Sequence, residues 1–311
     1  MSTHIRRTAK AARSIELYSA RILSTTIETP TVKSFVLHIP SPVPPSPSSP
    51  SSPSSPSSSS SPYSQSSPPS SPQSPPPFSF RPGQWLDVHI PDIPIVGGFS
   101  LTSSPSQFAN ANTFEIAIKK FDNPAAKWFH TVAKRNDVVS IRVGGDFWYD
   151  PQLDAGRHIV LIAGGVGINP IISIIATIAD DARSIDRQDP SRFPRLLPHR
   201  VSLLYTASTV AELLFLDRIR GITERNPLIF APPRFFVTRD TTATSPSGDP
   251  DLVTRRRITR DDVCTVLAGS SDAAVRPRFF VCGPPPMTDA MVGWLGEMGV
   301  EEGDVRFEKW W

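Results

Sequence analysis

Residues 161–170, LIAGGVGINP, join an apolar run to a turn that contains three glycines, an asparagine and a proline. The run predicts a buried strand that ends at Gly164, after which Gly165-x-Gly167 lets the backbone turn tightly. Asn169 is predicted to cap the following helix, and Pro170 fits the first helical turn. A helix N-terminus behind such a turn is suited to an anion such as a pyrophosphate, although glycine-rich turns also occur for purely structural reasons.

Strand and helix patterns alternate around this turn, from residue 156 to residue 311. Four apolar blocks, HIVLIAG, VSLLYTA, PRFFVT and PRFFVCG, alternate with helix-like stretches at residues 169–181, 209–221, 260–268 and 285–298. This alternation predicts a Rossmann-like, doubly wound α/β domain. Residues 158–179 contain no Asp, Glu, Lys or Arg, but their glycines, Asn169 and Pro170 divide them into a strand and a helix, so no membrane span is predicted.

The preceding residues, 15–155, read mainly as short strands separated by turns, with one helical stretch at residues 124–134. This pattern predicts a six-stranded antiparallel β-barrel. Residues 94–105, PIVGGFSLTSSP, place two glycines inside one of its strands. Glycine weakens a strand and commonly marks a place where a ligand or another backbone comes close.

Two segments lie outside this pattern. In residues 41–77, 33 of the 37 residues are Ser or Pro and none is charged, which predicts a disordered insert that is either a tolerated loop expansion or a protein-docking segment. Residues 1–14 carry four Arg or Lys side chains and no acid, which is compatible with a mitochondrial presequence or with a basic tail of a cytoplasmic protein.

The composition excludes several classes of function. The net charge of +3 comes from scattered residues that do not interleave with aromatics, so no nucleic-acid partner is predicted. The two cysteines cannot form a disulfide framework, and the six histidines show no metal-ligand spacing, so no metal is predicted.

Two further stretches carry candidate site residues. FFVCGPPPM, residues 279–287, predicts a strand that delivers Cys282 to its carboxyl end before a stiff turn into a helix. Cys282 is either a small buried apolar residue or a contact for a cofactor ring. VRFEKWW, residues 305–311, ends in Glu308, Trp310 and Trp311, whose rings either pack between domains or cover a planar cofactor.

In order, Pro82-Gly83-Gln84, Phe99-Ser100, the Gly164–Pro170 turn, Cys282-Gly283-Pro284 and Glu308 resemble the ferredoxin–NADP reductase superfamily, which pairs a flavin-binding barrel with a pyridine-nucleotide domain. The stretches PTVKSF, GQW, IVGGFS, RVGGDF and LIAGGVGINP resemble the oxidoreductase NAD-binding domain-containing protein 1 family in particular.

The resemblance implies a role for each matching position. Phe99 would stack on the flavin ring and Ser100 would hydrogen-bond near flavin N5, while Cys282 would sit beside the nicotinamide and Glu308 with a terminal Trp would close the site. Ser100, Cys282 and Glu308 are thereby the implied catalytic residues. The implied cofactor-binding residues are Gly98, Phe99, Ser100, Leu101, Gly164, Gly165, Val166, Gly167, Asn169, Pro170, Cys282, Gly283, Pro284, Met287, Trp310 and Trp311.

The sequence also departs from the superfamily pattern. Gly97 stands where an arginine normally pairs with the flavin phosphate, and Ala126 stands where a serine opens the barrel helix, so FAD is expected with weakened anchoring. Ser208 and Thr209 stand where enzymes specific for the 2′-phosphate present a base, which favours NAD(H) over NADP(H).

Two functions therefore remain open. The first is an oxidoreductase that transfers hydride from NAD(P)H to a bound flavin and on to a separate acceptor, since the chain has no cysteine cluster or haem motif of its own. The alternative is a nucleotide-binding protein with a reductase fold and little or no turnover. Gly97 and Ala126 favour the alternative, whereas Ser100, Cys282 and Glu308 favour the enzyme.

Overall fold

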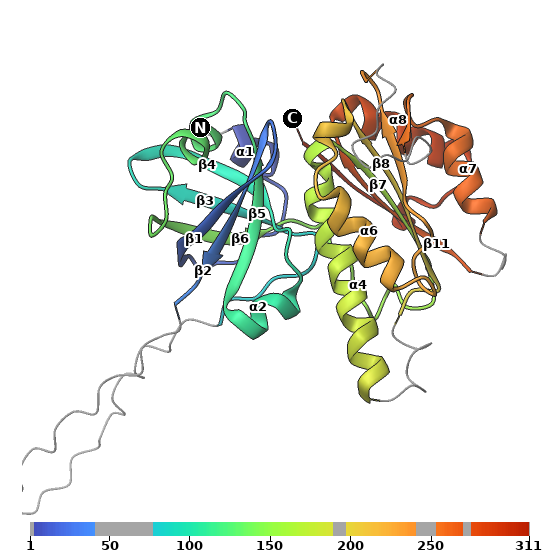
Figure 1. Ribbon diagram of the computed structural model, residues 1–311, viewed down its shortest axis with the longest axis horizontal. Coiled ribbons are helices and arrows are strands. Elements are labelled where there is room, and N and C mark those ends of the chain that lie inside the picture. The colour runs from blue at the N-terminus through green and yellow to red at the C-terminus, as the bar shows by residue number, and fades with distance from the viewer. Residues whose placement is uncertain (1–2, 41–76, 189–196, 241–252, 270–274, 311) are drawn as a thin grey trace, which may run out of the picture.

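The computed structural model describes residues 3–40, 77–188, 197–240, 253–269 and 275–310. The predicted disordered insert, apart from Pro77, lies outside these residues. Two units stand side by side, an antiparallel sheet domain formed by the N-terminal half and a parallel α/β domain formed by the C-terminal half (Figure 1).

The first domain is a six-stranded antiparallel sheet with the strand order β4-β3-β6-β1-β2-β5. A bridge between Leu101 and Ile116 joins the two edges, so the sheet closes as the predicted barrel requires. The strands are β1 (Tyr18–Thr29), β2 (Val32–His38), β3 (Trp85–Ile90), β4 (Ile93–Ser100), β5 (Thr113–Lys119) and β6 (Val138–Gly144).

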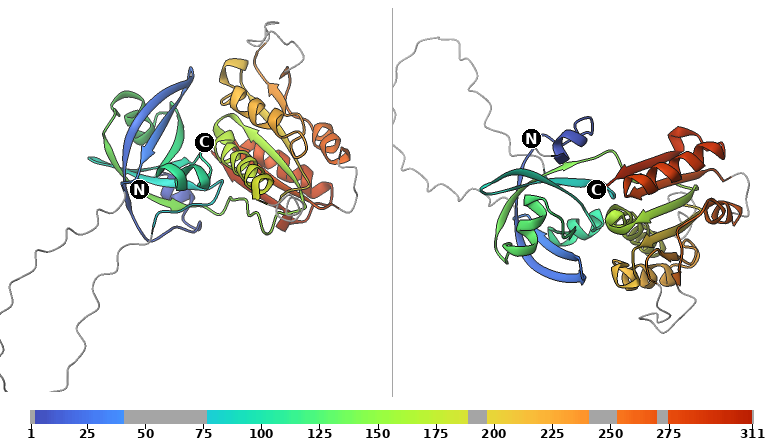
Figure 2. Two further views of the ribbon diagram at one scale, coloured as in Figure 1. Left: turned by 60° about the horizontal axis from the view of Figure 1, so that its bottom comes forward. Right: turned by 90° about the horizontal axis from the view of Figure 1, so that it is seen from above.

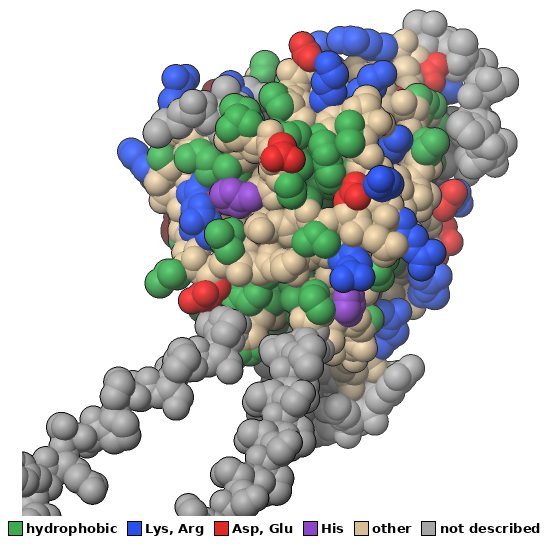
Figure 3. Space-filling model, turned by 90° about the vertical axis from the view of Figure 1, so that its left-hand side faces the viewer, with side chains coloured by type: hydrophobic (Ala, Val, Ile, Leu, Met, Phe, Trp, Pro, Cys, Tyr) green, Lys and Arg blue, Asp and Glu red, His purple; other side chains and the backbone are tan. Residues whose placement is uncertain are grey.

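Three short helices accompany this sheet: α1 (Thr3–Arg7), α2 (Pro105–Ala111) and α3 (Pro124–Thr131). The sequence predicted α3, which has Asn123 as its N-cap and proline in its first turn. It missed α2, whose seven residues bury no side chain and therefore carry no apolar periodicity. The outer face of the barrel shows basic side chains interspersed with apolar and acidic ones (Figure 3).

The second domain is a parallel six-stranded sheet with the order β10-β9-β8-β7-β11-β12, as a doubly wound fold requires. Its strands are β7 (His158–Gly164), β8 (Arg200–Ala207), β9 (Arg234–Val237), β10 (Val253–Thr254), β11 (Pro277–Gly283) and β12 (Val305–Lys309). Its helices are η1 (Gly165–Gly167), α4 (Ile168–Gln188), η3 (Val210–Glu212), α6 (Leu216–Arg225), α7 (Arg260–Ala268), α8 (Pro285–Glu297) and η4 (Glu302–Asp304).

Strand β7 lies at the centre of this sheet and every one of its residues is buried. Ile159 and Leu161 face the core formed with α4, whereas Val160 and Ile162 face the core formed with α7 and α8. Figure 2 shows helices on both faces of the sheet. The chain moves outward through β8 to β10 and then returns to β11 on the other side of β7. The carboxyl end of β7 is thus the switch point at which such sheets bind ligands.

Helix α4 begins directly behind this switch point. Within the described residues, one segment, Gly165–Ser184, is long and apolar enough to cross a membrane by composition, and 72% of its most apolar window is buried inside the protein. That burial is typical of a helix covering a central strand. The predicted helix at residues 209–221 is instead divided into η3 and α6, because Phe215 adopts a left-handed backbone conformation between them.

Candidate functional site

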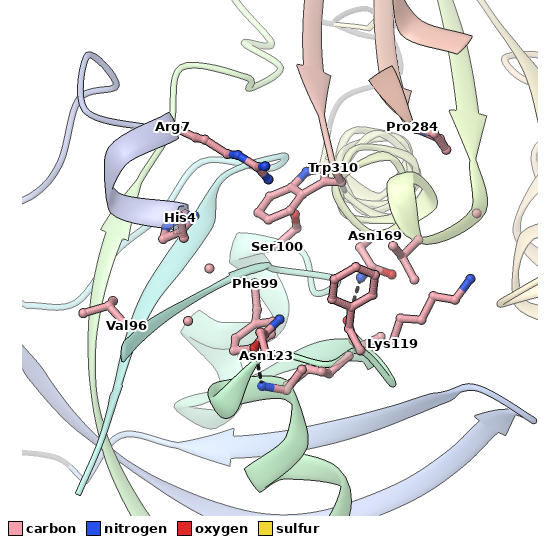
Figure 4. A pocket seen from close by; sticks show the side chains of 18 of the residues that line it. His4, Arg7, Val96, Phe99, Ser100, Lys119, Asn123, Asn169, Pro284 and Trp310 are labelled. Carbon is pink, nitrogen blue, oxygen red and sulfur yellow. Dashed lines mark hydrogen bonds between the residues drawn. The ribbon is translucent and has the colours of Figure 1, made fainter. Parts of the chain in front are cut away.

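A cavity of about 290 Å³ opens where the two domains meet. Its lining comes from α1, β4, β5 and the start of α3 on the barrel side, and from the Gly164–Asn169 turn, Pro284 and Trp310 on the other side (Figure 4). This volume lies at the lower end of the range for small-molecule sites, so the enclosed part suits one ring system and the remainder of a dinucleotide would extend along the cleft.

The two glycines of β4 are explained by close neighbours on opposite faces of the strand. A Cβ on Gly97 would lie 2.5 Å from the Phe99 ring and 2.8 Å from the Ala125 Cβ. A Cβ on Gly98 would lie 2.2 Å from the His4 imidazole. Both backbone approaches therefore require glycine. They leave Phe99 and the buried Ser100 side chain on the cavity wall.

The imidazole beside Gly98 is held by a buried carboxylate. Asp87 on β3 is fully buried and accepts hydrogen bonds from His4 Nε2 at 2.9 Å, Arg13 Nε at 2.9 Å and Arg142 at 2.6 Å. Burial would raise the pKa of Asp87, but the hydrogen bonds from His4, Arg142 and Arg13 outweigh it and lower the pKa to about 2.

The sequence predicts a basic tail or a presequence over residues 1–14, whereas residues 3–14 pack onto the barrel. Besides the contacts to Asp87, the Ser14 amide donates to the Val143 carbonyl at 2.9 Å, and the Gly145 amide donates to the Ala12 carbonyl at 2.9 Å. No local pattern indicates this packing, because Asp87, the partner of His4 and Arg13, lies more than seventy positions from both.

The glycine turn after β7 combines a tight approach with an open face. A Cβ on Gly167 would lie 2.2 Å from the Cys282 carbonyl oxygen, so β11 packs directly against the turn. Gly165 has a φ of +54° and open space where its Cβ would be. The Ile168 amide that opens α4 donates to the Gly165 carbonyl, so the amides without a partner in the helix are those of the Gly165–Gly167 turn, and these can bind an anion.

Asn169 is not the helix cap that the sequence predicted. It lies inside the first turn of α4, because the turn already coils from Gly165 onward. Its Nδ2 donates instead to the Ala117 carbonyl of β5 at 2.7 Å, which ties α4 to the barrel. Its buried Oδ1 has no hydrogen-bond partner within the described residues. Asn169 therefore connects the two domains at the floor of the cavity.

The structure places Cys282 behind the cavity rather than on its lining. Its side chain is fully buried in the core shared with α4, against which Val166 and Trp310 pack. Burial raises the pKa of its thiol, and the neighbouring Glu308 raises it further. The thiol is thus an inert core group. Cys282 instead supports the glycine turn through its backbone carbonyl, which packs against Gly167.

The C-terminal strand brings an acid and an indole to the cavity mouth. Trp310 lines the cavity and its Nε1 donates to Glu308 Oε2 at 2.9 Å. Burial raises the pKa of Glu308 to about 8, and hydrogen bonds from Trp310 and Trp85 oppose that rise. The Trp310 ring also lies nearly parallel to the His4 ring, with the centroids 6.2 Å apart. Trp311 lies outside the described residues.

The sequence matches known proteins along almost its whole length. It is 33% identical over 309 residues to the oxidoreductase NAD-binding domain-containing protein 1 of Danio rerio, covering 99% of this chain and 97% of that protein. The chain belongs to the oxidoreductase NAD-binding domain-containing protein 1 family. Residues 161–292 of this family member also match the model of the oxidoreductase NAD-binding domain.

Several solved structures share the fold of this family member. The flavohaem-like FAD/NAD-binding domain of a Vibrio cholerae nitric oxide dioxygenase superposes with a TM-score of 0.64 at 18% identity, covering 94% of this chain and 98% of that one. A Neisseria gonorrhoeae ferredoxin NADP⁺ reductase with bound FAD and NADP gives 0.62 at 19% identity, covering 95% and 99%. The chain therefore has the two-domain fold of reductases that bind FAD and NAD(P).

The residues of this family member fit a pyridine nucleotide. The open face of Gly165, the helix start behind it and Pro284 line one side of the cavity, next to a buried amide oxygen of Asn169 without a protein partner among the described residues. The backbone amides of the Gly165–Gly167 turn can bind a pyrophosphate, and Pro284 and Asn169 bound the space beside it.

The residues of the cavity fit the flavin ring of FAD but not its phosphates. Phe99, Ser100 and Trp310 offer two aromatic walls and a hydroxyl for the flavin ring. The phosphate positions do not fit, because Phe99 and Ala125 occupy the space that a side chain at position 97 needs. The Ala126 amide is also already bonded to the Asn123 side chain at 2.8 Å.

Most of the residues that the family resemblance implied do converge on one cavity. Gly98, Phe99, Ser100, Gly164, Gly165, Val166, Asn169, Pro284 and Trp310 line it, whereas Leu101, Gly167, Pro170, Cys282, Gly283, Met287 and Glu308 lie outside its lining. Met287 packs over Gly164 and Gly283, whose Cβ positions its side chain occupies. The sequence missed the lining residues His4, Arg7, Ile95, Val96, Ala117, Ile118, Lys119, Phe121 and Asn123, because no local pattern marks them.

Proposed function

We propose that this protein is an NAD(P)H-dependent oxidoreductase that transfers hydride to a flavin and passes the electrons to an acceptor. One observation carries the proposal. The nucleotide turn at Gly165 and the Phe99–Ser100 strand end line the same cavity, although they belong to different domains. A donor held by the turn and a ring held on the strand would therefore meet face to face.

Each side chain then has a definite task. The Gly165–Gly167 turn binds the pyrophosphate of the donor, and Phe99 and Trp310 bound the ring space from opposite sides. In this proposal the Ser100 hydroxyl, which lines the cavity, hydrogen-bonds near flavin N5. When bound, the flavin supplies the redox chemistry, since it takes two electrons and a proton from nicotinamide C4 and a second proton from solvent.

Glu308 is the proton-holding neighbour in this proposal. Because its pKa is raised to about 8, the carboxyl is largely protonated at neutral pH and holds the Trp310 indole by a hydrogen bond. Trp310 also packs on the core that contains Cys282. Cys282 is thus proposed as a positioning residue, which acts through Gly167 and Trp310.

We further propose NADH as the preferred donor. Ser208 and Thr209 follow β8, and the Asp240 carboxylate accepts from the Val210 amide at 3.3 Å. An acid at this turn disfavours the 2′-phosphate of NADPH by charge repulsion. The contact between Arg239 and Ser208 at this turn is made by the Arg239 backbone amide.

A nucleotide-binding protein with little or no turnover is the second candidate function. The capped Ala126 amide and the filled space at Gly97 favour it, because they remove two anchors that hold a flavin phosphate. The ring-binding part of the cavity favours the enzyme.

Spectroscopy separates the two candidates. The purified protein is titrated with FAD and then mixed anaerobically with NADH, and in a parallel sample with NADPH. The proposal expects a protein-bound flavin band that NADH bleaches faster than NADPH does. Absence of flavin binding, with NADH binding retained, would leave the nucleotide-binding function instead.

A further inference from the structure

On the phosphate side of the barrel site, position 97 has no room for a side chain. A Cβ at position 97 would already lie 2.5 Å from the Phe99 ring and 2.8 Å from Ala125, so α3 packs where an arginine side chain would pass. The absence of an arginine is therefore built into the packing of the strand against the helix.

The helix start that could replace this arginine is partly occupied. Pro124 has no amide hydrogen, and the Ala126 amide donates to Asn123 Oδ1 at 2.8 Å. The cap thus uses one of the two amide donors in the first turn of the helix, which reduces the number left for a phosphate.

The basic side chains that line the cavity come from other elements. Arg7 and His4 come from α1, and Figure 4 shows them across the β4 strand from Asn123. Lys119 is an exposed side chain at the end of β5. An exposed lysine is a weak substitute for a bidentate arginine, since water screens its charge.

We propose that the site recognises the flavin ring alone, so that riboflavin, FMN and FAD bind as exchangeable substrates and the reduced flavin leaves as the electron-carrying product. This inference rests on the proposed function and names its acceptor. The C4–H bond of NAD(P)H breaks and an N–H bond forms on the flavin. The nicotinamide loses two electrons, and the flavin gains them with that hydrogen and one proton from solvent. No further reductant or oxidant is required.

The test is an equilibrium titration of the full-length protein, without NADH, followed by flavin fluorescence. Riboflavin, FMN and FAD are expected to have dissociation constants within about threefold of one another, because each charged phosphate contact would otherwise separate them by about tenfold or more. Gel filtration is expected to strip any of the three flavins from the protein.

Either of two results overturns the inference alone: FAD or FMN binding at least about thirtyfold more tightly than riboflavin, or a stoichiometric flavin that survives gel filtration. Failure of all three flavins to bind overturns the proposed function as well. The two failures are thereby distinguishable.

A cap variant tests the physical cause. Asn123→Gly frees the Ala126 amide at little cost to the helix, because glycine is an acceptable N-cap. FMN and FAD are expected to bind about fivefold more tightly to this variant, with riboflavin unchanged. Asn136→Gly, at an exposed turn with a φ of +75°, is the matched control and should alter none of the three affinities. An unchanged FMN affinity in Asn123→Gly would contradict the assignment of the cap as the excluding group.

Discussion

His4 Nε2 lies 2.9 Å from Asp87 Oδ1, although 83 positions separate the two residues in the sequence. The contact anchors the N-terminal segment to the centre of the barrel and turns the imidazole against Gly98 and toward Trp310. A residue near the start of the chain thereby becomes part of the wall between the two domains.

Removing the buried carboxylate should destabilise the protein. In Asp87→Asn, Arg13 and Arg142 lose the partner that balances their charge, and we expect the free energy of unfolding to fall by about 3 kcal/mol. Urea denaturation measures the change. Asp92→Asn is a suitable control, because Asp92 is exposed at a φ of +63° that asparagine also tolerates. Equal stability of the two variants would contradict the prediction.

The same carboxylate predicts an acid dependence. Its pKa of about 2 in the folded state lies below the value of about 3.9 in an unfolded chain. Its contribution to stability is therefore complete above about pH 4 and is lost as the pH falls toward 2. The stability difference between wild type and Asp87→Asn should shrink between pH 5.5 and pH 3. A stability difference that grows as the pH falls from 5.5 to 3 would contradict the prediction.

The two glycines of the nucleotide turn should respond differently to alanine. Gly167→Ala places a Cβ against the backbone of Cys282 and should lower the free energy of unfolding by about 2–3 kcal/mol. The new Cβ in Gly165→Ala contacts no atom, but the φ of +54° lowers the free energy of unfolding by about 1–2 kcal/mol. We expect this variant to remain folded and to bind NADH more weakly. Thermal melts and NADH fluorescence distinguish them, with Gly293→Ala in α8 as the tolerant control.

Ser100→Ala should slow flavin reduction. Loss of one hydrogen bond to the reacting ring predicts a rate about three- to tenfold lower in anaerobic stopped flow. Ser140→Ala, on the exposed side of β6, should leave the rate unchanged. If both variants match the wild type, Ser100 is no part of the reaction.

The two cysteines should differ in their reactivity. Cys264 is exposed, whereas burial shields Cys282 and raises the pKa of its thiol. A maleimide should therefore add once to the native protein and twice after denaturation, as mass spectrometry of the intact chain would show. Modification of Cys282 in the native protein would contradict its placement in the core.

Local patterns were enough to predict the two-domain fold. The unbroken apolar run before Gly164 is typical of a central parallel strand, and the alternation of residues in the N-terminal half is typical of a sheet with one buried face. The glycine turn lies at the switch point of the parallel sheet, at the carboxyl end of β7. These features depend on residues within a few positions of one another, which is why they can be read along the chain.

Local reasoning failed where the partner lies far away. Asn169 has the composition of a helix cap, but its Nδ2 reaches the Ala117 carbonyl in the other domain. For Cys282 the local pattern left two interpretations open, a small buried apolar residue or a cofactor contact, and its side chain lies in the core beneath α4. In both cases the packing of separate elements, and not the local pattern, decided the direction of the side chain.

By itself, the sequence determined the two domains, the nucleotide turn and the strand end at Phe99-Ser100, because periodicity and glycine spacing act over short distances. Only the tertiary structure decided which groups pack against the two glycines of β4: His4 against Gly98 and Ala125 against Gly97. These contacts arise when the N-terminal segment and α3 pack against β4 within the first domain. Their packing determines which part of a flavin the site can hold.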